Sequence, residues 1–485
     1  MKKLLAGALV ALILLCAVVL LRGWQFGADA SPLETSASLT WDEARAIASL
    51  SAAIQIPTVS RGGNQPPDAE AFAAFHAFLK ERYPRVFSQL EVEVVAGQSL
   101  LLHWPASGEQ TPIMFLAHQD VVPVSGGSEE EWTHPPFAGV VADGFIWGRG
   151  ALDDKGSLIS LLEAAERLLA EGFVPERAIY FGFGHDEEVG GEGAKAMAAI
   201  LAERGVRLGF LLDEGGFVTK GLIPGVDGRV ALIGPAEKGY TSLKITARGV
   251  GGHASMPPRH TALGLVARAI NRLENNPFPA DLSFTRDTIM ALGAKAPFVQ
   301  RLVFANLWLF GPLAEATLAE MPTTAAGIRT TTAATMMTAG VKDNVLPHSA
   351  EAVVNFRILP GDTVESVIQY VTAVIDDPQI EVSLYSDFSN NPSKLAPLNS
   401  SGFKVLSQLI RQVRPDTTVA PRLVVGATDA RHFEEVSDAS YRFLGLEVGP
   451  EELAGMHGTN ERVSTASFID SARMYYFLMT RSAEL

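Results

Sequence analysis

Short apolar runs that end in acidic or histidine side chains constrain the fold of this chain more than any other feature. The runs PIMFLA, AIYFGF and GFLLD are apolar along their whole length, which is typical of strands covered on both faces. The periodicity of GSLISLLEAAERLLAEG predicts a helix between the first two runs, ending at Gly172. Alternating strands and helices predict an α/β fold with a mixed, largely parallel sheet covered by helices.

Metal-binding types of side chain recur at the ends of these runs. The set comprises His118 and Asp120 after PIMFLA, Asp153 and Asp154 in the loop GRGALDDKG, Glu187 and Glu188 after AIYFGF, Asp213 at the end of GFLLD, and His457 after YRFLGLEV. Open α/β sheets bind ligands outside the carboxyl ends of their strands, so these groups are expected to converge. Adjacent carboxylates repel each other and resist burial unless a cation lies among them.

The amino-acid composition limits which metal ions and which macromolecular partners the chain can bind. The single cysteine, Cys16, lies in the N-terminal apolar stretch, which excludes disulfides and thiolate ligands from the globular part. Imidazole and carboxylate donors without sulfur fit Zn²⁺, Co²⁺ or Mn²⁺, and this set is large enough for two ions that share one carboxylate. The residues therefore predict a dinuclear metallohydrolase. A net charge of −15 argues against a nucleic-acid partner.

Six motifs in this chain form a recognisable set: HQDVVPV, GRGALDDKGS, HDEEVGG, LLDEGG, GGHASMPP and HGTNERV. With them, the chain from about residue 41 onward resembles the zinc carboxypeptidase–aminoacylase family, in particular its Gly-Xaa carboxypeptidase and N-acyl-amino-acid hydrolase branch. The resemblance implies cleavage of the amide bond that releases a C-terminal amino acid from short peptides or N-acyl amino acids. Two alternatives stay open: a fatty-acyl-amino-acid hydrolase or aminoacylase with little peptidase activity, and an inactive metal-binding homologue.

The resemblance also implies a ligand set for two divalent ions per subunit, with Zn²⁺ expected and Co²⁺ or Mn²⁺ as alternatives. Asp153 would be shared by both ions; His118 and Asp213 would complete one site, and Glu188 and His457 the other. Asp120 would orient the imidazole of His118.

Further roles concern the reaction itself. The resemblance makes Glu187 the general base, which takes a proton from the attacking water and passes it to the leaving amine. It makes His253, in GGHAS, a stabiliser of the oxyanion that often reaches across a dimer interface, so a homodimer is expected.

Substrate contacts are assigned to two places in the chain. Asn344 and Arg357 are candidates for holding the terminal carboxylate of the substrate, although Arg357 could equally form a salt bridge at a strand edge. The segment GATDARHF contributes Thr428, Asp429 and Arg431 to the expected substrate-side wall, with Ala427 where the family branch has glycine.

The order of predicted strands and helices indicates a domain inserted into the catalytic domain. The catalytic parts are expected at residues 41–239 and 389–485, and a βαββαβ order over 240–388 predicts a ferredoxin-like α+β lid or dimerisation domain. A further insertion is expected at 277–337. Its apolar stretch FVQRLVFANLWLF, residues 298–310, most often indicates the core of a helix pair, but it could instead line a pocket or rest against a bilayer.

The N-terminus predicts attachment to a membrane. Leu4 to Leu21 are uncharged and long enough to span a bilayer, and Lys2 and Lys3 precede them, so residues 1–22 read as an anchor with the bulk of the chain outside the cytoplasm. Residues 23–40 would be a tether. A cleaved signal peptide and secretion are the alternative, with ADA at 28–30 as the cleavage site.

Overall fold

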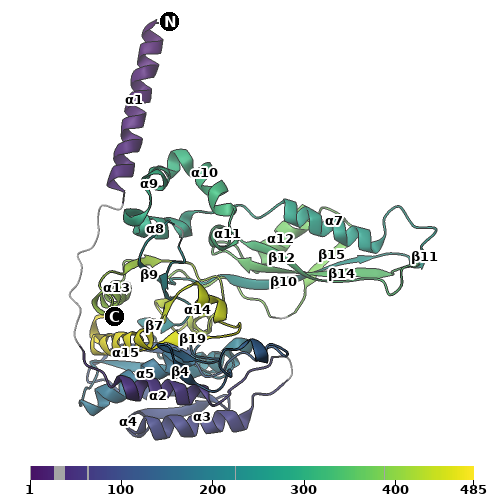
Figure 1. Cartoon of the computed structure of the whole chain (residues 1–485). Coiled ribbons are helices and arrows are strands. Elements are labelled where there is room, and N and C mark those ends of the chain that lie inside the picture. The colour runs from purple at the N-terminus through teal and green to yellow at the C-terminus, as the bar shows by residue number, and fades with distance from the viewer. Residues whose placement is uncertain (1, 27–38, 63–64, 224, 387) are drawn as a thin grey trace.

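The computed structural model describes residues 2–26, 39–62, 65–223, 225–386 and 388–485. Figure 1 shows three parts: a projecting N-terminal helix α1 (Lys2–Gln25), a main body that contains the C-terminus, and an elongated domain that extends sideways from that body. Part of the predicted tether, 27–38, lies outside the described residues.

A six-stranded sheet forms the centre of the main body. Its order is β1 (Glu91–Val95), β2 (Ser99–Trp104), β6 (Arg177–Gly184), β3 (Gln110–His118), β7 (Phe210–Asp213) and β17 (Ser440–Arg442). Strand β3 pairs in parallel with β6 and β7, and β17 pairs in parallel with β7. Strands β1 and β2 are antiparallel additions at one edge. The predicted mixed, largely parallel sheet is confirmed.

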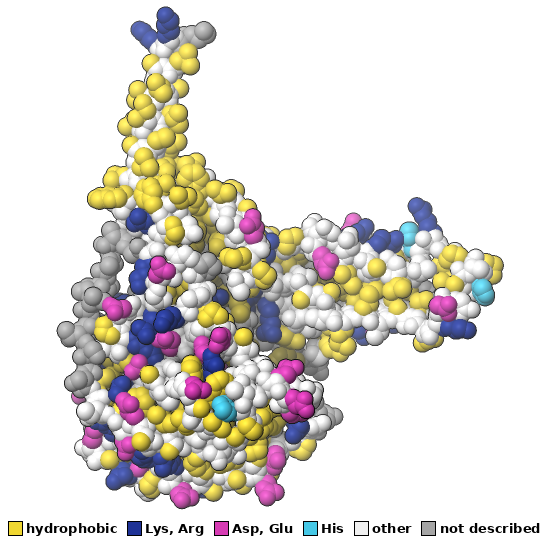
Figure 2. Space-filling model, in the orientation of Figure 1, with side chains coloured by type: hydrophobic (Ala, Val, Ile, Leu, Met, Phe, Trp, Pro, Cys, Tyr) yellow, Lys and Arg dark blue, Asp and Glu magenta, His cyan; other side chains and the backbone are white. Residues whose placement is uncertain are grey.

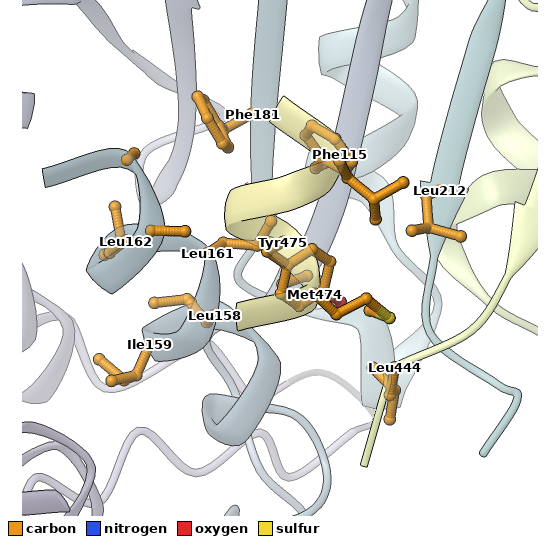
Figure 3. Close-up of a cluster of buried hydrophobic side chains, with 14 of the residues drawn as sticks. Phe115, Leu158, Ile159, Leu161, Leu162, Phe181, Leu212, Leu444, Met474 and Tyr475 are labelled. Atoms are coloured by element: carbon orange, nitrogen blue, oxygen red, sulfur yellow. The ribbon is translucent and has the colours of Figure 1, made fainter. Parts of the chain in front are cut away.

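Helices cover this sheet because each buries an apolar face against it. Helix α5 (Lys155–Ala170) packs between β3, α2 (Glu43–Ile54) and α15 (Thr465–Thr480), and nearly all of its side chains are buried. Figure 3 shows the resulting core, in which Leu158 and Leu161 of α5 lie near Phe115 of β3 and Tyr475 of α15. The opposite face packs against α6 (Glu192–Glu203).

Smaller elements complete the body. The other helices are α3 (Ala69–Arg82), α4 (Pro84–Gln89), α13 (Ser401–Val413) and α14 (Pro450–Gly455). Two small sheets follow the orders β16 (Thr418–Pro421), β9 (Arg229–Ile233), β8 (Val218–Lys220), β18 (Glu447–Val448) and β19 (Arg462–Ser464), β5 (Phe145–Trp147), β4 (Val140–Ala142).

The sideways domain is a four-stranded antiparallel sheet with two helices on it. The strand order is β12 (Thr331–Thr338), β14 (Ser349–Ile358), β10 (Gly239–Arg248) and β15 (Ile380–Leu384), packed against α7 (Ala262–Asn275) and α12 (Val364–Ile375). The predicted α+β order is present, but the second long strand is β12, which lies inside the range expected for the nested insertion. The VLP segment instead forms β13 (Val345–Leu346), which pairs with β11 (Gly252–His253) at the domain tip.

The nested insertion contains four α-helices between α7 and β12: α8 (Ser283–Leu292), α9 (Phe298–Ala305), α10 (Leu307–Ala319) and α11 (Pro322–Ile328). It lies at the base of α1 (Figure 1). The preferred interpretation of its apolar stretch as a helix-pair core is wrong, because Val299 is 71% and Trp308 57% exposed. Within the described residues, α1 is one helix with the length and apolarity of a membrane span; α9 and α10, bent by 118°, meet the same test only as a pair.

Candidate metal centre

Two groups of metal-binding side chains meet at the carboxyl edge of the main sheet. One comprises His118, Asp153 and Glu214, and the other Asp153, Glu188 and His457; within each group the donor atoms lie within 4.8 Å of one another. Asp153 belongs to both. Its Oδ1 lies 2.9 Å from Nε2 of His118 and its Oδ2 lies 3.0 Å from Nε2 of His457. One carboxylate thus presents one oxygen to each group, an arrangement that would allow two ions to share it.

Parallel pairing explains how the first donors converge. His118 is the last residue of β3, and Glu187 and Glu188 follow β6, which pairs with β3 in parallel. Asp120 connects the two segments. Its carbonyl lies 2.9 Å from Nδ1 of His118, and its carboxylate accepts hydrogen bonds from the backbone amides of Glu187 and Glu188, at 3.2 and 3.3 Å. Asp120 therefore leaves Nε2 of His118 facing the donor groups.

The loop that holds Asp153 is fixed by a buried ion pair that sequence reasoning missed. Oε1 of Glu461 accepts hydrogen bonds from the backbone amides of Gly150, Leu152 and Asp153, at 3.0, 2.9 and 3.2 Å. Its Oε2 accepts a 2.7 Å hydrogen bond from Arg149. Glu461 belongs to the HGTNERV motif, four residues after His457, and this proximity to a predicted ligand could have marked it as a residue of the site.

The structure places Glu214, not Asp213, in the first group. Both carboxylate oxygens of Asp213 accept backbone hydrogen bonds, from Glu214 at 2.9 Å and from Ala430 at 2.6 Å. The carboxylate of Glu214 instead lies 3.9 Å from Nε2 of His118. Asp213 is the ligand expected from the sequence, but in the structure its two carboxylate oxygens are engaged on the protein backbone. Glu214 is the residue that directly follows Asp213 in the motif LLDEGG.

His457 reaches the second group from an unexpected element. It follows helix α14 rather than a buried strand, and its backbone has a left-handed φ of 57°. Its Nε2 lies 3.2 Å from Oε1 of Glu188.

The electrostatics of the two groups favour cations. Burial raises the pKa of Glu214 and of Glu187 well above the ordinary glutamate value, and the adjacent carboxylates contribute in the same direction. Hydrogen bonds to Asp153 and Glu188 raise the pKa of His457 to about 10. Without cations Glu214 and His457 therefore retain protons, which bound ions would displace. Despite burial, hydrogen bonds from the two histidines of these groups lower the pKa of Asp153 and keep it charged. Imidazole and carboxylate donors at this spacing fit two divalent metal ions.

A large cavity opens from these donors. Its volume is about 1240 Å³. The polar part of its lining includes Asp153, Glu187, Glu188, Glu214 and His457. An apolar part is lined by the nested insertion, including Phe284 and Ile289 of α8, Val303 and Phe304 of α9, and Leu313 and Leu318 of α10. The insertion thus extends the site into an apolar pocket.

The expected substrate-binding residues divide into two locations. Arg357 lines the cavity with its guanidinium 4.9 Å from the Tyr240 ring centroid, so no strand-edge salt bridge is needed to explain its place. Thr428 and Arg431 also line it, and Arg431 donates a 3.0 Å hydrogen bond to the Gly190 carbonyl. Asp429 is buried, and burial raises its pKa well above the ordinary value.

His253 and Asn344 lie elsewhere, at the exposed tip of the sideways domain. The backbone amide of Ala254 donates to the Asn344 carbonyl, at 3.1 Å, so the two residues share one small structure. Figure 1 shows this tip, labelled β11, at the end of the domain farthest from the main body. The structure does not bring them to the metal donors of their own chain.

A mixed, largely parallel sheet whose carboxyl edge carries two metal-donor groups sharing one aspartate, with a half-buried glutamate beside them, defines a dinuclear metal centre of the kind that metallohydrolases use. The chain belongs to peptidase family M20/M25/M40, whose family model matches residues 114–481.

Individual relatives agree with this assignment. The chain is 38% identical over 436 residues to "Probable carboxypeptidase S-like 2" of Dictyostelium discoideum, covering 89% of this chain and 83% of that one. It is 38% identical over 493 residues to "N-fatty-acyl-amino acid synthase/hydrolase PM20D1" of Xenopus tropicalis, covering 99% and 95%. Its fold matches the M20 family metallo-carboxypeptidase Sso-CP2 from Sulfolobus solfataricus with a TM-score of 0.64 at 16% identity, covering 91% and 99%.

Proposed function

We propose that this enzyme hydrolyses the amide bond of N-acyl amino acids with long acyl chains, releasing an amino acid with a free α-carboxylate. The observation that carries this proposal is the cavity of about 1240 Å³, which joins the metal donors to an apolar lining from α8, α9 and α10. Each buried CH₂ group contributes about 0.8 kcal/mol, so a long chain in this lining would strengthen binding considerably. Short peptides with a free carboxylate are the second candidate, because one relative is named a carboxypeptidase.

The ligand set proposed for two Zn²⁺ ions is His118, Asp153, Glu214, Glu188 and His457, with Asp153 shared. Ions bound there would supply Lewis-acid polarisation of the scissile carbonyl and lower the pKa of water. Glu187 lies beside these donors and lines the cavity, and burial raises its pKa well above the ordinary glutamate value. A carboxyl group with a raised pKa can take a proton from the attacking water and return it to the leaving amine near neutral pH.

The released amino acid carries a carboxylate that needs a cationic partner. Arg357 is proposed for this role, because its planar guanidinium lines the cavity and can form two parallel hydrogen bonds to a carboxylate. Thr428 and Arg431 are proposed to shape the same wall. His253 and Asn344 are proposed to act in a homodimer, where the domain tip of one subunit would reach the site of the other and stabilise the oxyanion.

The N-terminal helix is proposed to remain as an anchor, with the main body outside the cytoplasm. Phe26 is only 7% exposed and packs against Gly293 of the insertion, so cleavage at residues 28–30 would remove a packed side chain. Lys2 and Lys3 precede the apolar stretch, which favours a cytoplasmic N-terminus.

The test compares two substrates on the full-length, zinc-loaded protein. N-palmitoyl-leucine and the blocked dipeptide N-acetyl-Gly-Leu would be offered side by side, with leucine release quantified and Glu187→Gln as the inactive control. We expect a kcat/KM at least about 100-fold higher for the palmitoyl substrate, since several CH₂ groups would enter the apolar lining. Preferential release from the dipeptide would favour the carboxypeptidase function instead.

The proposed dimer is tested by subunit mixing. His253→Ala and Glu187→Gln should each be inactive alone, because one lacks the oxyanion donor and the other the base. Mixed dimers should regain activity, since one site then combines an intact Glu187 with an intact His253 from its neighbour. A mixture that stays inactive after subunit exchange would refute action across the interface.

A further inference from the structure

The end of the N-terminal helix docks onto the nested insertion. Nδ2 of Asn306, at the bend between α9 and α10, donates a 3.1 Å hydrogen bond to the carbonyl of Val19 in α1. Gly23 is buried against Leu302 of α9, so closely that a Cβ at Gly23 would lie 2.5 Å from Leu302 Cδ2. Phe26 packs on Gly293. Along these three contacts the residue numbers rise in α1 and fall in the insertion, so the two segments run in opposite directions.

These contacts set the depth of the insertion relative to a bilayer. Leu4 to Leu21 form the apolar part of α1, which at 1.5 Å per residue spans about 27 Å, close to the thickness of a bilayer core. Val19 lies inside that stretch, two residues before its end. Asn306, which contacts Val19, must lie at the same depth. The bend between α9 and α10 is therefore level with the outer part of the hydrocarbon layer.

The surface around this bend is suited to that environment. We define the bend surface by its exposed side chains Phe298, Val299, Trp308, Leu309 and Leu313, each at least 41% exposed. Residues 302–314 contain no charged side chain. Figure 2 shows hydrophobic side chains covering the insertion at the base of α1, continuous with the hydrophobic surface of the helix. Exposed apolar surface that adjoins a membrane span indicates contact with lipid.

Two residues of the bend surface, Val299 and Leu313, also lie at the entrance of the cavity. Val299 is 71% exposed and Leu313 55% exposed, yet both line the cavity that reaches the metal donors. A side chain that faces both solvent and a cavity lies at its mouth. The apolar mouth and the surface level with the hydrocarbon layer therefore coincide.

We propose that the bend surface inserts into the bilayer leaflet nearest the main body, so that the cavity opens into the membrane and takes its acyl substrate directly from the lipid phase. The delivery of substrate rests on the proposed N-acyl-amino-acid hydrolysis, whereas the membrane contact rests only on the proposed anchor role of α1. The nested insertion would thus contact the membrane as a second element beside α1. The acyl chain of the substrate would enter the cavity first, and its carboxylate would follow toward Arg357.

Membrane contact can be measured by spin-label depth on the full chain in phospholipid vesicles. Cys16 is the single cysteine, so Cys16→Ala gives a cysteine-free background. Labels would be placed at Leu309, at Val299 and, as the matched control, at Val174, an apolar residue of the main body that is 58% exposed. We expect the Leu309 label to be accessible to oxygen and shielded from a polar nickel complex, the Val299 label to be intermediate, and the Val174 label to show the reverse. A Leu309 label as accessible to the nickel complex as the Val174 label would overturn the proposal.

Substrate delivery is tested with Leu309→Glu, a position outside the cavity lining, against Val174→Glu. With N-palmitoyl-leucine dissolved in the vesicles, Leu309→Glu should lower kcat/KM about ten-fold, because a carboxylate resists entry into lipid. Water-soluble N-acetyl-Gly-Leu should be turned over at an unchanged rate, however slow, and Val174→Glu should change neither. Equal losses with both substrates, or no loss with the palmitoyl substrate, would overturn delivery from the bilayer. If the wild type cleaves neither substrate, the proposed function fails, whereas the depth measurement still decides the membrane contact.

Discussion

Substitutions at the adjacent residues Asp213 and Glu214 should affect different properties. A change at Asp213 should lower the stability of the fold, and a change at Glu214 should lower the metal content. In the structure the carboxylate of Asp213 accepts two backbone hydrogen bonds, whereas that of Glu214 faces His118 and Asp153. Asp213→Asn should therefore destabilise the fold with or without metal. Glu214→Gln should leave the metal-free fold nearly unchanged and remove one of two bound ions.

The magnitudes follow from those contacts. An asparagine at 213 can accept only one of the two amide hydrogens and turns its own NH₂ toward the other, which leaves a buried donor unsatisfied at a cost of about 2–3 kcal/mol. Burial among carboxylates raises the pKa of Glu214 well above its ordinary value, so in the metal-free protein its charged form is already disfavoured. Glutamine at 214 should then change the metal-free stability by less than about 1 kcal/mol. A metal present at a thousand times its Kd stabilises by about 4 kcal/mol, which this variant would forfeit.

The assay is zinc content by mass spectrometry together with denaturant unfolding of metal-free and zinc-loaded protein. Wild type should bind two zinc ions per subunit, Asp213→Asn should retain two at moderate zinc excess, and Glu214→Gln should retain one. If Asp213→Asn lost one ion while Glu214→Gln kept both, the assignment of Glu214 as the ligand would be refuted.

Three further perturbations test other parts of the argument. Glu187→Gln should lower kcat by about 10³-fold while both metals remain bound, because it removes a proton carrier and no ligand; loss of a metal would make Glu187 a ligand instead. Glu461→Gln should cost about 3–5 kcal/mol in unfolding free energy, since it leaves buried Arg149 unpaired; a change below 1 kcal/mol would contradict its structural role. Lys238 is buried, and its Nζ donates hydrogen bonds to the carbonyls of Ala326 and Arg329 at the end of the nested insertion. Burial lowers its pKa to about 7, so over pH 7–10 the unfolded chain binds a proton that the folded chain lacks. The free energy of unfolding should therefore rise with pH in that window by up to about 1.4 kcal/mol per unit. Lys238→Met should flatten this rise in Tm measured from pH 7 to 10, and an unaltered slope would exclude Lys238 as its source.

Much of the site could be read from the sequence because the information is local. A uniformly apolar run that ends in His118 or in Glu187 and Glu188 specifies both a covered strand and the side chains at its carboxyl end. Parallel pairing of β3 and β6 then brings those ends together, as expected. Two sequence-based predictions fail for local reasons as well. Strand β12 is missed because its Thr- and Ala-rich sequence lacks the apolar alternation that indicates a strand. The apolar stretch 298–310 is interpreted as a helix-pair core because half-exposed apolar helices resemble core helices when only composition is known.

The sequence by itself therefore determined the α/β class, the chemistry of the donors and the edge of the sheet where they gather, since hydrophobic periodicity and residue type are properties of short segments. Tertiary structure alone decided which of two neighbouring acids turns toward the metal donors, because an amide from Ala430, 217 residues away, holds Asp213 aside. It also decided that α1 docks on the nested insertion and that the insertion completes the cavity. Such contacts join segments far apart in the chain, and their free energy depends on a shape that no single segment encodes.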